Sequence, residues 1–406
     1  MFRQLAKSSW GNGRGERKFN WSVVYNQRNL YIFGFLLALV VTFLEVMRGR
    51  HMNFIVFADA TRDFWQGIHP YTEEFVASHG RFFLYSPTFT VLFAPFAYLP
   101  AWLGPFVWNL SNYTLFFVSV FTLPKWFTYQ QKCRIFLFLL PILGQSLLSF
   151  QYNVAVTYLF LFAYTLLEKK HHFWAILLIM ISACTKIYGV FELAILLCYP
   201  RLWRNLSYAV VIGGLLLAMP LLKLAPGEFF PYYGEWFQSL STHQAFATYE
   251  SLYFAEPFSN WLLPHFRALQ IGTLLLLALL FFANYRKWEL PAFRLQALSI
   301  LMGWVVLLSD SAEKHTYIIA LAGFILWYWS RSERTIIDRI LFWSCFFLLC
   351  IVPIDIIVPV PVMQFITRAL WLHVWVFFIV WIRMISLTFL SPHKQMIESP
   401  IKNKKE

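Results

Sequence analysis

Apolar runs long enough to cross a membrane recur along almost the whole chain, and this feature constrains the fold most. Hydrophobic residues make up 59% of the 406 residues and charged residues only 13%, whereas soluble domains contain about 45–50% and about 25%. The chain therefore has too little polar surface to cover a water-soluble globule. Since one crossing takes about 20 apolar residues, we expect an all-α, polytopic integral membrane protein with about 10–12 transmembrane helices.

The candidate spans are separated by short polar loops. They cover roughly residues 29–47, 105–123, 135–149, 153–167, 172–183, 187–199, 206–225, 269–284, 293–309, 316–330, 337–353 and 369–386. The two runs of 172–199 are each short for a full crossing, which favours a bent helical hairpin that reaches mid-membrane and returns. A further run, 87–100, contains three prolines and is predicted to be a re-entrant or interfacial element.

The basic residues predict how the chain is oriented. With the N-terminus in the cytoplasm, most of the 33 Lys and Arg residues fall in inside loops and tails, as the positive-inside rule requires. This predicts a multi-pass protein of the cell membrane with both termini cytoplasmic. Its parts are a basic tail (1–28), a transmembrane domain (29–389) with outer loops at 48–104 and 226–268, and a second tail (390–406). The net charge of +13 is scattered over short loops, which argues against a nucleic-acid partner.

The first outer loop concentrates ionisable residues beside the bilayer. They are Asp59, Arg62, Asp63, His69, Glu73, Glu74, His79 and Arg81. Ionisable groups at this level are costly and are by default functional candidates. If 54–66 is helical, Asp59 and Asp63 share a face at i, i+4. We therefore expect a helical first outer loop that acts on a substrate at the outer face, although the positive-inside bias alone would also leave acids there.

The second outer loop, 226–268, is rich in aromatic residues. Aromatic side chains at this level form interfacial belts in membrane proteins, and aromatic faces also stack on sugar rings. The sequence leaves these two interpretations open.

No motif for a metal, a nucleotide or another cofactor stands out. The five cysteines form no CxxC pair, and small buried hydrophobes are the better account of them. The glycines at 11–15 lack the preceding strand of a phosphate-binding loop. We predict a site that needs neither a metal nor a cofactor.

Short motifs along 53–205, followed by one late element, occur in an order and spacing that resemble a known enzyme family. They are Asn53-Phe54-Ile55-Val56-Phe57, Gly67-Ile68-His69-Pro70-Tyr71, Tyr85-Ser86-Pro87, Leu99-Pro100, Trp108-Asn109-Leu110-Ser111-Asn112, Phe150-Gln151-Tyr152-Asn153, Lys186-Ile187-Tyr188, Arg201-Leu202-Trp203-Arg204 and Ser309-Asp310-Ser311-Ala312-Glu313-Lys314-His315. Together they resemble glycosyltransferase family 87, the polyprenol-phosphate-mannose-dependent mannosyltransferase-like membrane enzymes of the GT-C class.

The resemblance implies a GT-C-like fold and an inverting transfer of a hexose of the mannose type. The donor would be a polyprenyl-phosphate sugar, and the acceptor a lipid-linked or glycan hydroxyl at the outer face. Such a site needs a base near the acceptor hydroxyl, cations for the leaving phosphate and an apolar groove for the polyprenyl tail. The expected partners are this donor, this acceptor and membrane lipids.

One departure from the family pattern affects the base. The family's acid opens the first motif, eighteen residues before the tyrosine that closes the Gly motif, and here that position is Asn53. An amide cannot act as a base towards the acceptor hydroxyl. We predict that Asp59 takes the catalytic role with Asp63 beside it, and His69 and Glu74 are further candidates.

The other motif residues are candidates for substrate binding, and each has a structural alternative. Lys186 would contact the donor phosphate, or pair with Glu192, or snorkel to the interface. Gln151 and Asn153 would bind substrate or cap helix ends. His315 would contact the phosphate or acceptor, or cap a helix in solvent. The remaining predicted binding residues are Asn53, His69, Tyr71, Arg81 and Tyr85.

Two other functions stay open on the sequence alone. A transporter or flippase of a lipid-linked sugar fits the hairpin around Lys186, because transporters carry broken helices near the midplane, but no matching half follows. A catalytically silent relative that binds glycolipid fits the loss of the acid at Asn53. Movement of a lipid-linked sugar across the membrane without sugar transfer would favour the transporter or flippase. Binding of glycolipid without movement or transfer would favour the silent relative.

Overall fold

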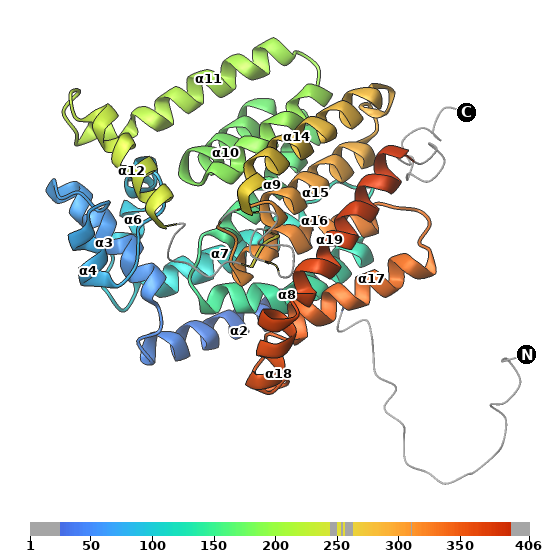
Figure 1. Cartoon of the computed structure of the whole chain (residues 1–406), viewed down its shortest axis with the longest axis horizontal. Helices are drawn as coiled ribbons and strands as arrows, with labels where there is room; N and C mark the ends of the chain where they lie inside the picture. Colours follow the sequence, from blue (N-terminus) through green and yellow to red (C-terminus); the bar gives the residue numbers. More distant parts are fainter. Residues whose placement is uncertain (1–24, 244–249, 253–254, 256–262, 310, 391–406) are drawn as a thin grey trace, which may run out of the picture.

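The computed structural model describes residues 25–243, 250–252, 255, 263–309 and 311–390. Within these ranges the regular elements are all helical, which confirms the predicted all-α, polytopic class (Figure 1). Five helical stretches there are long and apolar enough to cross a membrane. They are α2 (Gln27–Met47), α8 (Tyr129–Leu148), α11 with η2 (Leu202–Leu222), α14 (Phe266–Ala283) and α19 with η8 (Leu372–Leu390). Most of the predicted tails, 1–28 and 390–406, lies outside the described residues.

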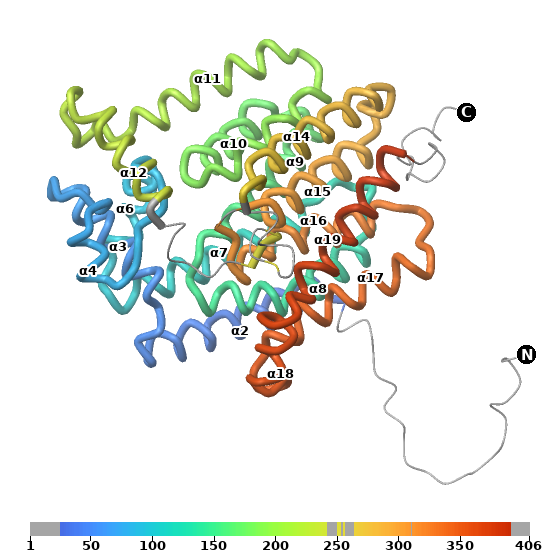
Figure 2. Tube along the Cα trace, in the orientation of Figure 1, coloured from blue at the N-terminus to red at the C-terminus, as the bar shows by residue number. Residues whose placement is uncertain are grey.

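Shorter helices occupy the other predicted spans. They are α7 (Gly104–Phe121), α9 (Asn153–Glu168), α10 (His172–Thr185), η1 (Ile187–Cys198), α15 (Pro291–Leu307), α16 (Tyr317–Trp329) and α17 (Ile336–Phe346), which η6 (Phe347–Ile351) extends. Because successive crossing helices run in opposite directions, their loops gather at two ends of the bundle, as the trace in Figure 2 shows.

The two ends of the bundle are defined by two sets of contacts. At the end called here the cavity end, Asn153 bonds both Lys186 and Gln151. At the opposite end, called the far end, Glu168 bonds Tyr199 and Arg294. The start of α2 and the end of α19 both lie at the far end, where Tyr25 and Arg383 contact residues of α8 and α17.

The two long connections that were predicted to be outer loops contain short helices at the cavity end. The first contains α3 (Met52–Gln66), α4 (Glu73–His79), α5 (Pro87–Leu92) and α6 (Ala94–Ala97). The second contains α12 (Phe229–His243) and η3 (Leu263–His265). Figure 1 shows α3, α4, α6 and α12 grouped on one side of the bundle. The helix predicted at 54–66 is confirmed by α3. The remaining short elements are η4 (Tyr285–Lys287), η5 (Lys314–Thr316), α18 (Val360–Gln364) and η7 (Phe365–Ala369).

Helices α15 and α16 form the centre of the bundle. In α16 every residue from Tyr317 to Tyr328 is buried, as expected for a helix that is apolar all round. The peripheral helices instead expose apolar side chains, among them Phe33 on α2, Val210 on α11 and Leu279 on α14. Exposed apolar faces on the outside and a dry centre are the arrangement that a lipid environment stabilises.

The hairpin of α10 and η1 carries Lys186 at its turn. Helix η1 ends beside Glu168, which accepts a hydrogen bond from Tyr199, and the turn of the hairpin lies at the cavity end next to Asn153. Gly189 makes the turn possible. A Cβ on Gly189 would lie 2.6 Å from the carbonyl carbon of Ser182 and closer still to the backbone nitrogen of Ala183. The absence of a side chain at 189 therefore lets η1 pack directly on the last turn of α10.

We expect Gly189→Ala to destabilise the protein and to weaken the position of Lys186. The added methyl would meet backbone atoms that cannot move independently, and such overpacking costs about 1–3 kcal/mol. The matched control is Gly272→Ala in α14, where a Cβ meets nothing within 4 Å and helix propensity favours Ala by about 0.5–1 kcal/mol. Thermal unfolding in detergent should show a lower midpoint for Gly189→Ala only. Equal midpoints for the two variants would contradict this account.

Candidate functional site

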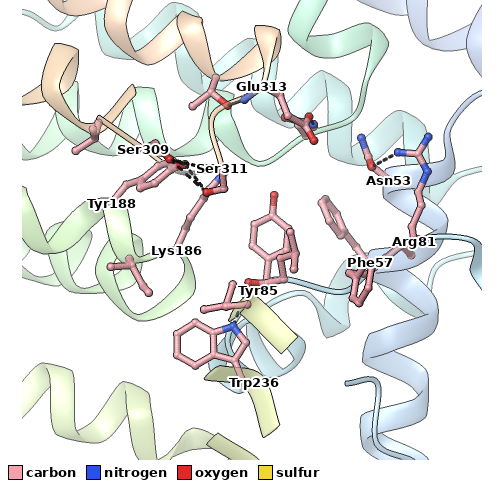
Figure 3. A pocket seen from close by; sticks show the side chains of 18 of the residues that line it. Asn53, Phe57, Arg81, Tyr85, Lys186, Tyr188, Trp236, Ser309, Ser311 and Glu313 are labelled. Carbon is pink, nitrogen blue, oxygen red and sulfur yellow. Dashed lines mark hydrogen bonds between the residues drawn. The ribbon is translucent and has the colours of Figure 1, made fainter. Parts of the chain in front are cut away.

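A cavity of about 550 Å³ opens at the cavity end of the bundle. Its walls come from α3, the segment 80–85, the α10–η1 turn, α12, α14, α15 and the segment 308–316. The size is within the range of small-ligand sites, which are concave and mainly apolar with a few placed polar groups. Figure 3 shows its labelled residues, with Tyr85 between the pair Asn53 and Arg81 on one side and Tyr188, Ser309 and Ser311 on the other.

The Lys186 ammonium reaches the cavity from the α10–η1 turn. It donates a hydrogen bond to Asn153 Oδ1 at 2.7 Å, and its Nζ lies 4.7 Å from the centre of the Tyr188 ring and 5.7 Å from that of Tyr85. No described carboxylate lies within 4 Å of Nζ, so the pair with Glu192, which was one structural alternative for Lys186, is not formed. Glu192 is buried, and neither of its carboxylate oxygens has a hydrogen-bond partner among the described residues. An ammonium with ring and amide contacts alone keeps its capacity to bind an anion.

Two amides connect Lys186 to a carboxylate on the same wall. Asn153 Nδ2 donates to Gln151 Oε1, and Gln151 Nε2 donates to Glu313 Oε2. Asn153 Nδ2 also lies 3.4 Å from Thr316 Oγ1. Since Asn153 gives its oxygen to Lys186, its amino group must point to Gln151, and Gln151 must then donate to Glu313. This chain of hydrogen bonds, called here the amide relay, holds the Lys186 ammonium and the Glu313 carboxylate in fixed positions. It joins three segments that lie far apart in the sequence.

Asn53 and Arg81 form the opposite side of the cavity. Arg81 Nη1 donates to Asn53 Oδ1 at 3.2 Å, and Asn53 Nδ2 donates to the carbonyl of Ser149 at 2.6 Å. Both halves of the amide are thus used. A carboxylate at position 53 could accept from Arg81 but would place an oxygen against the Ser149 carbonyl. The local bonding therefore suits an amide at this position.

Aromatic and hydroxyl groups fill the space between these walls. Trp236 of α12 faces the cavity and donates its indole N–H to the carbonyl of Leu84 at 3.0 Å. The Tyr188 hydroxyl lies 3.0 Å from Ser309 Oγ and 3.4 Å from Ser311 Oγ. These groups offer flat ring faces and hydrogen-bonding hydroxyls, which are the contacts that a sugar takes.

One part of the cavity is apolar. Phe191 of η1 packs on Trp304 of α15, with ring centres 4.5 Å apart. Val305, Leu308 and Leu240 line the cavity near them. This side combines residues of η1 and α15 with Leu240 of α12, and its apolar surface is suitable for a hydrocarbon chain.

A comparison with protein families places the chain in a known class. The model of glycosyltransferase family 87 matches residues 83–309, which is more than half of the chain. The chain belongs to glycosyltransferase family 87. As a member of this family with a polytopic helical fold, it is a membrane glycosyltransferase. No curated protein matches the chain.

The cavity is lined by five of the residues that the sequence analysis selected for substrate binding. Asn53, Arg81, Tyr85, Gln151 and Lys186 all line the cavity, and they come from four segments. Asn153 stands behind them as the partner of Lys186. The structure thus brings together most of the predicted binding residues.

The two predicted catalytic acids lie elsewhere on α3. Asp59 accepts from Arg62 Nη1 at 2.9 Å and lies 3.1 Å from His79 Nε2, so both of its oxygens are engaged. Neither Asp59 nor Asp63 is among the residues that line the cavity. Burial, together with the charge of Asp59, raises the pKa of Asp63 above its usual value. Their catalytic roles stay predictions.

Three further predicted residues support the walls from outside. His69 Nδ1 lies 2.7 Å from Glu235 Oε2 and so joins the first outer loop to α12. Tyr71 donates to the carbonyl of Tyr85 at 2.8 Å. His315 has a buried Nδ1 without a hydrogen-bond partner among the described residues, and burial beside Lys314 lowers its pKa to about 3. A neutral His315 supplies no positive charge to a phosphate.

Glu313 and Trp236 are cavity residues that sequence reasoning did not select. Glu313 belongs to the late motif, where His315 was chosen instead, and the position of Glu313 just before η5 is the signal that it starts a helix at the cavity wall. Trp236 lies in the aromatic second loop, where the sequence left a belt and a sugar site as alternatives. In the described residues no group of three or more His, Cys, Asp and Glu is arranged to hold a metal ion.

The two acids of α3 should affect stability in opposite ways. The raised folded-state pKa of Asp63 means that its ionisation costs folding free energy at neutral pH, and this cost disappears as the pH falls through its folded pKa towards about 4. Asp63→Asn should therefore leave the thermal midpoint unchanged or raise it at pH 7, with the gain shrinking on acidification. Asp59→Asn should lower stability by about 0.5–1 kcal/mol, because it weakens the contacts to Arg62 and His79.

The control for these variants is Glu74→Gln, which changes an exposed carboxylate of the same loop. Thermal unfolding between pH 7 and pH 4 is the measurement. Equal losses for Asp59→Asn and Asp63→Asn at pH 7 would contradict the assigned environments.

Proposed function

We propose that this family 87 enzyme transfers a hexose of the mannose type from a polyprenyl-phosphate sugar to a lipid-linked or glycan hydroxyl, with inversion. The observation that carries the proposal is the Lys186 ammonium, which has no described carboxylate within 4 Å and faces a cavity that also contains a carboxylate and aromatic rings. An ammonium that is not paired with a carboxylate can form a charge-assisted hydrogen bond with a phosphate oxygen. Membership of glycosyltransferase family 87 is the reason to expect sugar transfer as the reaction.

The reaction would be a single displacement at the anomeric carbon. The acceptor oxygen forms the new bond to this carbon while the bond to the phosphate oxygen breaks, and the bond's electron pair leaves with the polyprenyl phosphate. Lys186 and Arg81 would balance the negative charge on that phosphate. A carboxylate would take the proton of the acceptor hydroxyl, which contributes about 10²–10⁴-fold to such rates.

Two carboxylates are candidates for this base. Asp59 is the acid predicted from the sequence, and its place in α3 is close in sequence to the family's position at Asn53. Glu313 is the one carboxylate among the described cavity-lining residues. Cavity access supports Glu313 as the stronger candidate, since a base must reach the hydroxyl within one hydrogen bond or one water.

The remaining cavity groups fit the two parts of the donor. The rings of Tyr85, Tyr188 and Trp236 would stack on the hexose, and Ser309 and Ser311 would bond its hydroxyls. The apolar surface around Phe191 and Trp304 would take the first isoprene units of the lipid. With the far end in the cytoplasm, as the basic loops predict, the cavity would open at the outer face.

Transfer assays on two variants separate the candidate bases. With Glu313 as the base, Glu313→Gln should lower kcat about 10²–10⁴-fold while donor binding changes little, and Asp59→Asn should keep most activity. The assay is radiolabelled hexose transfer from polyprenyl-phosphate mannose by the purified full chain in lipid discs. Glu73→Gln, which changes an exposed carboxylate of α4 that is not a candidate base, is the control. The reverse pattern would make Asp59 the base.

Lys186 should govern donor binding. Lys186→Met removes a charge-assisted contact of about 1.5–3 kcal/mol, so the donor Kd should rise roughly tenfold or more, and Lys186→Arg should recover part of this affinity. Gln270→Leu, at another cavity-lining position without charge, is the control. An unchanged donor Kd in Lys186→Met would show that Lys186 does not contact the donor phosphate.

The same experiments address the silent-relative alternative, which the loss of the acid at Asn53 favours. Donor binding by the wild type without any transfer, under conditions where a family member is active, would support it. Movement of intact donor across the membrane without transfer would support a flippase instead.

A further inference from the structure

We propose a second binding site at the far end of the bundle, between α8 and α17, for the phosphate of an anionic phospholipid. Its centre is Trp329, with Arg134 and Arg334 on the ring. The site is separate from the cavity, because α16 begins beside the cavity residue Thr316 and its 13 residues extend about 20 Å to Trp329.

Two guanidinium groups stack on the single indole of Trp329. The Cζ atom of Arg334 lies 4.6 Å from the ring centre and that of Arg134 lies 5.5 Å from it. Arg134 also approaches Tyr25, and Arg334 approaches Tyr328 at 4.9 Å. Stacking of this kind fixes the planes of both guanidinium groups. The Trp329 Nε1 atom is buried and has no acceptor among the described residues, so a hydrogen-bond donor is also left over.

The positive charge at this place is not balanced by the described residues. No described carboxylate lies within 4 Å of the guanidinium groups of Arg134, Arg334 or Arg339. Asp338 is already bound by Arg331 at 3.2 Å and by Arg383 at 3.0 Å. Glu333 is exposed in the same turn and makes no ion pair with the stacked arginines. Since like charges held close together repel, an oxyanion between them would be bound favourably, and guanidinium forks match phosphate oxygens.

The surroundings indicate that this phosphate belongs to a lipid. Next to the arginines, α17 and the start of η6 expose a stripe of apolar side chains at helical spacing, Ile336, Ile340, Trp343 and Phe347, each at least half exposed. Helix α8 lies beside this stripe, and the centre of its Phe138 ring is 5.7 Å from that of Trp343. An acyl chain can lie along this stripe with its phosphate at Arg134 and Arg334. Basic pockets between membrane helices bind lipid head groups in this way.

The test is lipid binding by the delipidated full chain in neutral detergent, measured by native mass spectrometry. Phosphatidylglycerol, phosphatidylcholine and inorganic phosphate are the probes. We expect wild type to bind phosphatidylglycerol more tightly than phosphatidylcholine, and inorganic phosphate at millimolar concentration to leave this binding unchanged. The double variant Arg134→Gln with Arg334→Gln should lose about tenfold to thirtyfold in phosphatidylglycerol affinity. Arg286→Gln changes an exposed arginine at the same end, whose side chain contacts Tyr285 and makes no ion pair with the described residues. Its affinity should stay within about twofold, since a single surface charge contributes little.

Each contrary outcome would overturn a stated part of the proposal. Equal losses in the double variant and in Arg286→Gln would show general attraction to a basic surface and no site. Displacement of the lipid by inorganic phosphate would make the ligand a soluble phosphate compound. If the glutamine pair does not fold, the lysine pair Arg134→Lys with Arg334→Lys keeps the charge but not the planar fork. Its affinity for phosphatidylglycerol should fall several-fold. If the lysine pair bound this lipid as tightly as the wild type, the guanidinium groups would not be what recognises the phosphate.

Discussion

The hydrogen bond between the Lys186 ammonium and Asn153 is the contact on which the cavity depends. An ammonium among apolar helices is costly unless polar groups surround it, and here an amide oxygen and two tyrosine rings do so without neutralising it. Because the same amide continues through Gln151 to Glu313, the cation and the carboxylate are held at fixed places. The bundle thus presents opposite charges to one cavity without letting them pair directly.

The amide of Asn53 plays a similar part on the opposite side of the cavity, since it also bonds a cation through its oxygen and another segment through its amino group. Asn53 accepts from Arg81 and donates to the Ser149 carbonyl, so it holds the arginine of the segment 80–85 against the end of α8. A carboxylate cannot donate to that carbonyl. The altered first motif is therefore matched by its surroundings, and the cavity obtains its carboxylate from Glu313 in another segment.

Local chemistry explains which features were predictable from the sequence. The helix over α3 and the crossing helices follow from apolar periodicity and length, which need no distant partner. The sequence could single out Lys186, which lines the cavity, because a lysine between two apolar runs is costly and is by default a functional candidate. Asp59 shows the limit of this reasoning, since spacing along a helix gives the face of a carboxylate but not what packs on that face. In the structure that partner is the pair Arg62 and His79.

The sequence by itself determined that the chain is an all-helical membrane protein, that its basic loops share one end, and that Gln151, Asn153 and Lys186 are polar groups in an apolar setting. Only the tertiary structure decided which of these groups meet. Hydropathy is a property of each segment, whereas the relay to Glu313 and the stacking of Arg134 and Arg334 on Trp329 join segments far apart in the chain. Such contacts depend on how helices pack, because packing fixes the distances over which hydrogen bonds and ring contacts act.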